Sequence, residues 1–185
     1  MVLNETDRKT RDERLSQLVK YCMISGALDL NLYAEYDVKR GLRESDGKGV
    51  LTGLTEISDV TGFKTIQGEK VPCEGELYYQ GYNVMDLKKG FEQRRFNFEE
   101  VTYLLLFGAL PDKQQLREFI DLLNQYRELP SKFVRDVIMK APSLNIMNAL
   151  QRSVLTLYSY DENPDDISIE NVLRQALTLI ATMPL

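Results

Sequence analysis

The chain has 185 residues, 43% of them hydrophobic and 28% charged, with a formal net charge of −5. This balance is typical of a soluble globular chain, and the negative charge argues against broad nucleic-acid binding, which needs a basic face. Histidine is absent, so these residues hold no histidine base, no serine or cysteine nucleophile paired with histidine, and no imidazole metal site.

Targeting and cysteine patterns give further limits. No apolar run reaches the roughly 18 residues of a membrane span, and the charged first residues lack the apolar core of a signal peptide. Cys22 and Cys73 lie far apart, without a CxxC spacing. We therefore expect free thiols, a cytoplasmic location and no membrane or metal partner.

In chain order, helical periodicity first predicts an amphipathic helix over residues 5–24 and a short helical turn over 31–36. Residues 50–80 change character: Gln67-Gly68 predicts a short hairpin, and residues 76–80 predict another short strand. Asn83 is expected to cap a brief helix, followed by a polar connector over 88–97. The predicted fold class is mainly α with a small β-hairpin region near residues 50–80.

The centre of the chain, residues 97–123, reads as two helices joined by a tight corner. Asn97 and Glu100 have capping-box spacing at the start of the first helix, which is apolar almost all round. Gly108 and Pro111 are expected to end this helix. A second capping box, with Asp112 as the cap, is expected to begin the next.

Three more helices are predicted: one after a Ser131 cap, one over 146–158 and one over about 168–183. The last two carry more apolar surface than one contact face buries, so either a core role or an interface fits them. The candidate interface residues are Ala149, Ser153 and Thr156 on one helix and Leu173, Ala176, Leu177 and Ile180 on the other.

Other patterns have ordinary explanations beside functional ones. The glycine-rich stretch 41–49 lacks the strand and the Gly-Lys-Ser/Thr ending of a phosphate-binding P-loop, so a plain loop is expected. Its basic residues and their neighbours form either a solvated cluster or an anion contact. The carboxylate pairs 99–100 and 165–166 suit helix N-termini. Tyr78, Tyr79 and Tyr82 suit packing better than base stacking.

Several blocks, taken together, resemble the N-terminal part of citrate synthases, of the bacterial type with a long N-terminal extension. They are Gly41-Leu-Arg43, Gly53-Leu-Thr-Glu-Ile-Ser58, Glu76-Leu-Tyr-Tyr-Gln-Gly-Tyr82 and Phe98-Glu-Glu-Val-Thr-Tyr-Leu-Leu-Leu-Phe-Gly-Ala-Leu-Pro111. The resemblance runs from about residue 38 to the end. It implies a helical extension over 1–40 and an incomplete N-terminal portion of the family's large domain over 41–185.

The resemblance also implies the chemistry. Family members are helical homodimers that condense oxaloacetate with acetyl-CoA to citrate and CoA in the tricarboxylic acid cycle. The family's catalytic aspartate and two histidines match no residue here. The expected fragment therefore has no catalytic residue and no cofactor, and should be inactive alone. Acetyl-CoA is a substrate of the parent enzyme.

Two contacts follow from the resemblance. Arg43 matches an arginine near the CoA phosphates, although Glu44 replaces a glycine of that motif. The helices near 146–158 and 168–183 match helices of the homodimer interface. Two alternatives remain open: a 2-methylcitrate synthase fragment acting on propionyl-CoA, and a non-catalytic helical interaction or dimerisation module.

Overall fold

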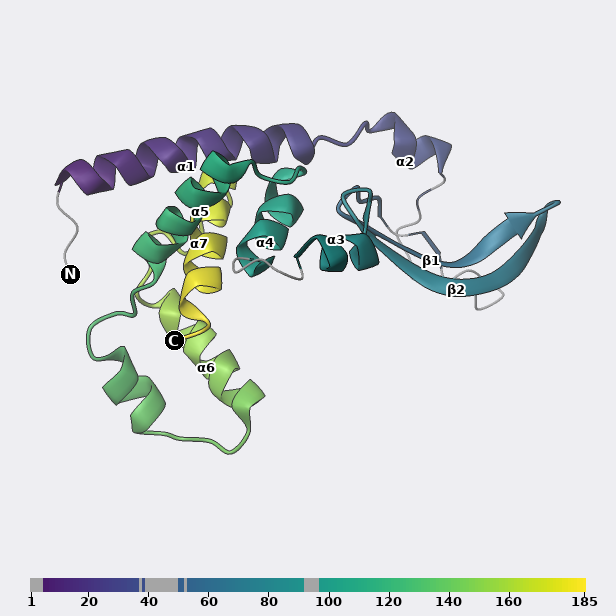
Figure 1. Ribbon diagram of the computed structural model, residues 1–185. Coiled ribbons are helices and arrows are strands. Elements are labelled where there is room, and N and C mark those ends of the chain that lie inside the picture. Colours follow the sequence, from purple (N-terminus) through teal and green to yellow (C-terminus); the bar gives the residue numbers. More distant parts are fainter. Residues whose placement is uncertain (1–4, 37, 39–49, 52, 92–96) are drawn as a thin grey trace. The chain divides into compact units, whose positions relative to one another are not determined.

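Figure 1 shows the chain as a computed structural model that describes residues 5–36, 38, 50–51, 53–91 and 97–185. Two compact units are present: unit 1 combines residues 1–20 with 117–185, and unit 2 comprises residues 21–116. The described elements are α1 (Glu5–Ser25), α2 (Asn31–Glu35), β1 (Ser58–Ile66), β2 (Glu69–Tyr79), β3 (Tyr82–Asn83), α3 (Val84–Phe91), α4 (Asn97–Phe107), α5 (Lys113–Tyr126), η1 (Val134–Met139), α6 (Ile146–Tyr158) and α7 (Ile169–Thr182). Helices predominate, which confirms the predicted mainly α fold.

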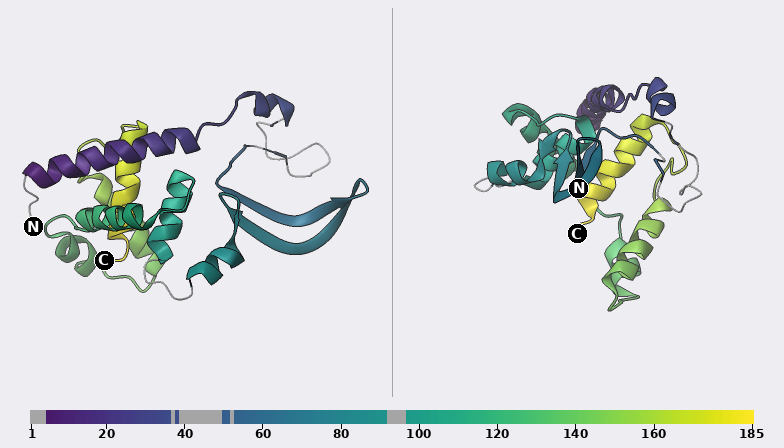
Figure 2. Two further views of the ribbon diagram at one scale, coloured as in Figure 1. Left: turned by 45° about the horizontal axis from the view of Figure 1, so that its top comes forward. Right: turned by 90° about the vertical axis from the view of Figure 1, so that its right-hand side faces the viewer.

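In unit 2, β1 and β2 form an antiparallel ribbon that curves along its length (Figure 2), and β3 adds a short third strand. The turn between β1 and β2 is the predicted one. Gln67 and Gly68 both have positive φ, 53° and 86°, as a type I′ hairpin turn requires. The prediction of short strands is wrong. β2 continues through Pro72, which pairs with Phe63, and a register shift accommodates residues 73–75 opposite Gly62.

α3 follows the sheet directly. The Asn83 side-chain oxygen accepts a hydrogen bond of 2.8 Å from the Met85 amide, which confirms Asn83 as the residue that starts this helix. The helix continues to Phe91, so a polar connector beginning at residue 88 is wrong. Leu87 and Phe91 lie one turn apart and are buried in a common cluster with Leu104. Burial of Phe91 explains the extra turn.

α4 begins at Asn97 and ends before Gly108, as predicted, but the side chain of Asn97 does not have the predicted role. Asn97 is its first residue, and its side-chain amide donates a 3.1 Å hydrogen bond to the Phe91 carbonyl. Its side-chain oxygen is buried and accepts no hydrogen bond from the described residues, so the predicted Asn97 cap is not formed there. The end of α4 agrees with prediction, because Gly108 has φ +80° and donates its amide to the Leu104 carbonyl at 2.9 Å.

α5 begins with the predicted capping box. The Asp112 carboxylate accepts hydrogen bonds from the amides of Gln114 and Gln115, at 2.7 and 2.8 Å. The Gln115 side chain accepts the Asp112 amide at 2.9 Å. Phe119 and Leu123, four residues apart, are both buried, which places one face of α5 in a core.

The helix predicted after Ser131 differs in type. Val134–Met139 form a π-helical turn, η1, and Ser131 does not cap it. Lys132 has a left-handed φ of 69° and Phe133 is buried, whereas Val134 and Ile138 are exposed. Phe133 is thus the buried apolar side chain of this turn, and Val137 is half-buried.

Candidate functional site

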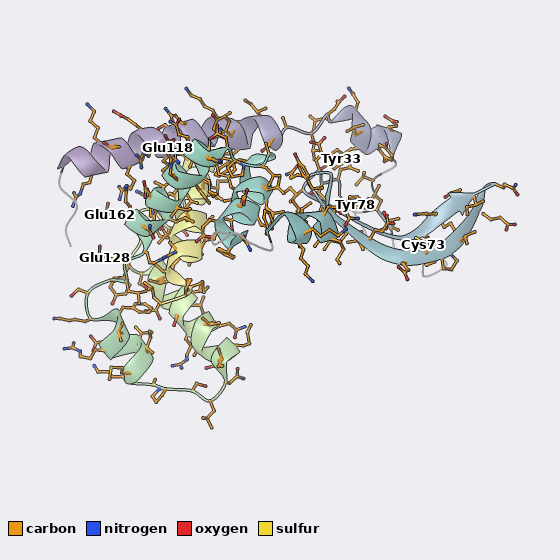
Figure 3. All side chains as sticks on the ribbon, in the orientation of Figure 1. Tyr33, Cys73, Tyr78, Glu118, Glu128 and Glu162 are labelled. Atoms are coloured by element: carbon orange, nitrogen blue, oxygen red, sulfur yellow. The ribbon has the colours of Figure 1, made fainter. Side chains whose placement is uncertain are left out.

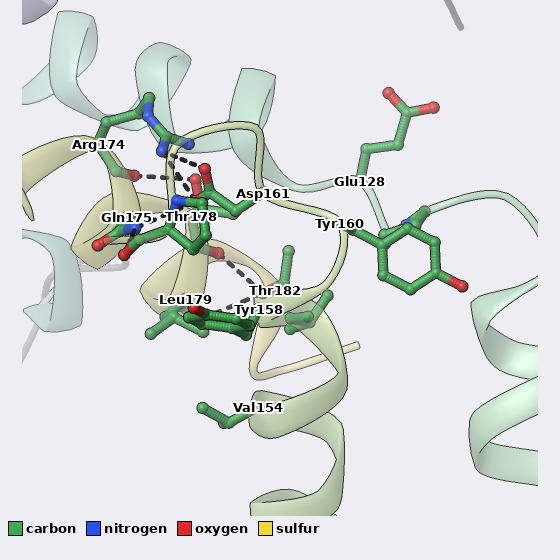
Figure 4. A pocket seen from close by; sticks show the side chains of 13 residues that line it. Glu128, Val154, Tyr158, Tyr160, Asp161, Arg174, Gln175, Thr178, Leu179 and Thr182 are labelled. Atoms are coloured by element: carbon green, nitrogen blue, oxygen red, sulfur yellow. Dashed lines mark hydrogen bonds and ion pairs between the residues drawn. The ribbon is translucent and has the colours of Figure 1, made fainter. Parts of the chain in front are cut away.

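A cavity of unit 1 lies beside α6, α7 and the acidic segment 161–166 that joins them. It has a volume of about 280 Å³, and its walls combine apolar side chains with a few polar ones (Figure 4). Val154 and Leu157 come from α6, and Leu179 comes from α7. The segment between α5 and η1 contributes Glu128 and Pro130 to the lining of the cavity.

Each helix beside the cavity has a side-chain cap. Asn145 accepts the Asn148 amide at 3.0 Å at the start of α6. The Ser168 side chain accepts a hydrogen bond of 3.3 Å from the backbone amide of Asn171 at the start of α7, close to the predicted start of that helix. These caps set where both helices begin and therefore which side chains reach the cavity.

A polar cluster holds the acidic segment against α7. Arg174 donates two hydrogen bonds from one guanidinium nitrogen to the Asp161 carboxylate, at 2.6 and 2.8 Å (Figure 4). The side-chain amide of the buried Asn171 donates hydrogen bonds to the backbone carbonyls of Asn163 and Asp166, at 2.8 and 2.7 Å. Gln175 donates to Asp161 as well, at 3.3 Å. The segment 161–166 is thus fastened to the first two turns of α7.

The charges in this cluster are matched. Burial of Asp161 disfavours its ionised form, but hydrogen bonds from Arg174 and from the Asn163 backbone outweigh that effect and lower its pKa. The carboxylate is therefore ionised at neutral pH, and its negative charge balances the positive charge of the guanidinium beside it. Such a pair is suited to holding a loop in place.

The sequence pattern did not single out this cluster. Asn171 and Arg174 are three residues apart on one helix, directly after an acidic loop, and this spacing places them on the same face. That combination was the available signal. It was missed because the acidic residues were interpreted only as partners of the helix dipole, a role that Asp166 does partly fill through the Ser168 amide at 2.9 Å.

The candidate interface residues separate into two groups. Leu173 and Leu177 are buried inside the chain, with 4% and 0% of their surface exposed. Ala149, Ser153, Thr156, Ala176 and Ile180 are half-buried. The strongly exposed apolar side chains of α6 are others, among them Ile146 and Leu155, each 73% exposed. The homodimer interface stays a prediction, with Leu173 and Leu177 placed in the core.

The remaining candidates that the structure describes lie in unit 2. Arg43, like the whole 41–49 segment, lies outside the described residues. Cys73 and Tyr78 lie along β2 (Figure 3), and Tyr78 donates a 2.9 Å hydrogen bond to Glu76. Tyr79 packs against the Leu87 cluster, which agrees with a packing role. Both cysteines are free thiols.

Across the described ranges, no group of three or more cysteine, aspartate or glutamate side chains is placed to hold a metal ion. Within the same residues, none of the helices is both long enough and apolar enough to cross a membrane. The candidate site therefore consists of the cavity, the ion pair between Arg174 and Asp161, and the exposed apolar side of α6.

Comparison with known proteins relates this arrangement to a family. Residues 42–185 match the family model described as "Citrate synthase, C-terminal domain". A citrate synthase of Haloferax volcanii is 33% identical over 80% of this chain and 35% of its own length. A 2-methylcitrate synthase of Corynebacterium glutamicum is 28% identical over 82% of this chain and 35% of its own length.

A solved structure agrees. The citrate synthase of Pyrobaculum aerophilum is 30% identical, with a TM-score of 0.56, over 77% of this chain and 36% of that chain. The present chain thus spans about a third of the length of the relatives it matches. The family match covers most of this chain, so the chain belongs to the citrate synthase family.

Proposed function

We propose that this chain forms part of an enzyme that condenses oxaloacetate with the acetyl group of acetyl-CoA, giving citrate and CoA. The observation that carries this proposal is the family match over residues 42–185, with relatives named as citrate synthases. Apart from the contact of Arg43 with CoA proposed below, the part proposed for these residues is structural. They supply helices, a cavity and a fastened loop, and the histidines expected for the condensation are not among them.

The first experiment measures CoA release in the presence and absence of oxaloacetate. The 185-residue chain alone should give none, because no side chain in it can take the histidine roles that the resemblance implies. The longest product of its gene, purified in parallel, should release CoA only with oxaloacetate present. Oxaloacetate-dependent turnover by the 185 residues alone would contradict this assignment of the chemistry, and an inactive longer product would contradict the proposed function.

A 2-methylcitrate synthase acting on propionyl-CoA is the second candidate, favoured by the Corynebacterium glutamicum relative that matches 82% of this chain. The two substrates differ by one methylene, which changes kcat/KM by about 10–200-fold when an apolar pocket distinguishes them. Measuring kcat/KM of the longer product with both thioesters therefore assigns the activity. A ratio in favour of propionyl-CoA supports the second candidate.

A homodimer is proposed through α6 and α7. Ala149, Ser153 and Thr156 form a strip of small side chains on α6 on which a partner helix can lie close, while the exposed apolar side chains of α6 favour burial at about 25 cal/mol per Å². In an isologous contact near a two-fold axis, each copy covers the same α6 and α7 surface of the other copy. A non-catalytic interaction module would use the same surface. The two functions are distinguished by activity, because the longer product of an interaction module would show no turnover.

Sedimentation velocity tests the dimer. Ala149→Arg should shift the population toward monomer, and Gln151→Arg, at an exposed position on the same helix, is the matched control that adds the same charge. A clean monomer of the unaltered longer product at tens of micromolar contradicts the homodimer. Leu177→Asp is unsuitable as an interface test, because Leu177 is buried within the chain.

Arg43 is proposed to contact the CoA phosphates. A phosphate contact made equally in the ground and transition states raises KM when removed and leaves kcat unchanged. Arg43→Ala in the longer product should therefore raise the KM for acetyl-CoA alone. The compartment proposed is the cytoplasm, supported by the two free thiols, which a reducing environment preserves.

A further inference from the structure

The helix α1, which precedes the family match, contacts residues inside the matched region. The match begins at residue 42, and α1 ends at Ser25, so the whole of α1 precedes the matched region. In unit 2, the last turn of α1 touches the corner that follows α4. The Cys22 thiol donates a 3.6 Å hydrogen bond to the Leu106 carbonyl. This contact joins residues 84 positions apart in the sequence.

Gly108 makes the approach possible. A Cβ atom added to Gly108 would lie 2.9 Å from the Cβ atom of Ser25, a separation that real Cβ atoms do not adopt. Gly108 also has φ +80°, so its conformation and its neighbour each favour glycine. Gly81 has the same φ of +80° but nothing within 4 Å of an added Cβ. Comparing alanine substitutions at Gly81 and Gly108 therefore distinguishes the cost of backbone strain from the cost of the contact with Ser25.

In unit 1, the earlier turns of α1 meet the end of α5. The Arg11 guanidinium lies 5.5 Å from the centroid of the Tyr126 ring, within the range of a cation–π contact. Leu15, four residues on and therefore on the same face of α1, is 4% exposed. Burial raises the pKa of the Tyr126 hydroxyl, which agrees with a covered ring.

We propose that α1 docks on two surfaces of the family-matched region and stabilises each of them. One surface is the Leu106–Gly108 corner in unit 2, where glycine leaves space for Ser25. The other is the Tyr126 end of α5 in unit 1, where the Arg11 guanidinium lies over the ring and Leu15, on the same face of α1, is buried. Leu15 of α1 belongs to the buried interior of unit 1, and the last turn of α1 packs on the corner of unit 2, so α1 stabilises each unit through its own contact.

The first test uses the intact chain with Cys73→Ser, so that Cys22 is its single thiol. Gly81→Ala measures the effect of alanine at φ +80° without a contact, and Gly108→Ala adds the collision with Ser25. We expect the unfolding equilibrium constant to rise at least about tenfold more for Gly108→Ala than for Gly81→Ala. Adding Ser25→Gly to Gly108→Ala should remove that excess, because the colliding side chain is gone.

Cys22 reports docking directly. Its reaction rate with a thiol reagent under native conditions should rise about tenfold or more in Gly108→Ala and stay unchanged in Gly81→Ala. If Gly108→Ala does not fold, recovery of folding by Ser25→Gly is the deciding measurement. Equal effects at the two glycines, an unchanged Cys22 rate in folded Gly108→Ala, or failure of Ser25→Gly to rescue would overturn the contact in unit 2.

The contact in unit 1 is tested on the same helix. Leu15→Ala should raise the unfolding equilibrium constant at least about tenfold, whereas Ile24→Ala, which truncates an exposed side chain of α1, should change it less than about twofold. Similar effects of the two substitutions would overturn the proposal for unit 1. Urea titration of the intact chain supplies both values.

Discussion

α6 and α7 are helices of nearly the same length, 13 and 14 residues, and they use their apolar side chains differently. α7 has five buried residues, Asn171, Leu173, Leu177, Ala181 and Thr182. α6 has none in the same burial class, and Leu155 near its C-terminal end is strongly exposed. Two sequences with similar helical patterns therefore have different roles: α7 builds the core of unit 1, and α6 presents apolar surface.

The comparison also changes how the interface prediction is read. Leu173 and Leu177 were expected to face a second copy, and the fold uses both inside the chain. The half-buried strip on α6 and its exposed neighbours remain accessible to a partner. Substitutions on the two helices should consequently affect different properties, chain stability for α7 and association for α6.

The largest effect is expected at Leu177. Leu177→Asp places an unpaired carboxylate where no surface is exposed, so it should lower the free energy of unfolding by more than about 4 kcal/mol or prevent folding. Leu155→Asp, the same change on the exposed side of α6, should stay within about 0.5 kcal/mol. Urea unfolding measures both. Similar losses would show that α6 is as buried as α7, against the comparison.

A smaller effect is expected from the charged clusters of the two helices. Arg174→Gln removes the partner of the largely buried Asp161 carboxylate and should cost about 1.5–3 kcal/mol. Arg152→Gln on α6 is the control: its hydrogen bonds, to Asn148 and the Ala141 carbonyl, are exposed, so the loss should be below about 1 kcal/mol. Equal losses would contradict the assignment of Arg174 as the residue that fastens the acidic segment.

The same cluster predicts a pH dependence. The pKa of Asp161 is lower in the folded chain than the usual value of about 3.9 for an unfolded aspartate. Its stabilising effect is therefore complete above about pH 4 and is lost as the pH falls through the lowered pKa. Stability measured from pH 6 to pH 2.5 should fall less steeply below about pH 4 in Asp161→Asn than in the unaltered chain, and parallel profiles would contradict the prediction.

The smallest effect is expected at the caps. Asn145→Ala and Ser168→Ala each remove a side-chain acceptor for a helix amide and should cost about 1 kcal/mol. Circular dichroism and unfolding midpoints together sharpen the comparison. Loss of helix in Asn145→Ala without a shift of the main midpoint would show that α6 unfolds separately from α7.

Local chemistry visible in the sequence determined the ends of several elements. The Asp112 capping box, the Gly108 helix end and the Gln67-Gly68 turn all depend on groups within four residues of one another. The resemblance likewise rested on short blocks, and the family match bears it out. Interactions of this range are encoded where they act, so they could be predicted without the fold.

The tertiary structure decided what the helices and strands contact. Asn97 donates to the Phe91 carbonyl in place of the predicted cap, Phe133 is buried after the left-handed Lys132, and Arg174 pairs with Asp161 in the loop before its helix. Periodicity predicted that Leu173 and Leu177 share a face, but whether that face meets the chain's own core or a partner depends on residues distant in sequence. Burial is a property of the assembled contacts, and a helical pattern alone specifies only which side chains enter them together.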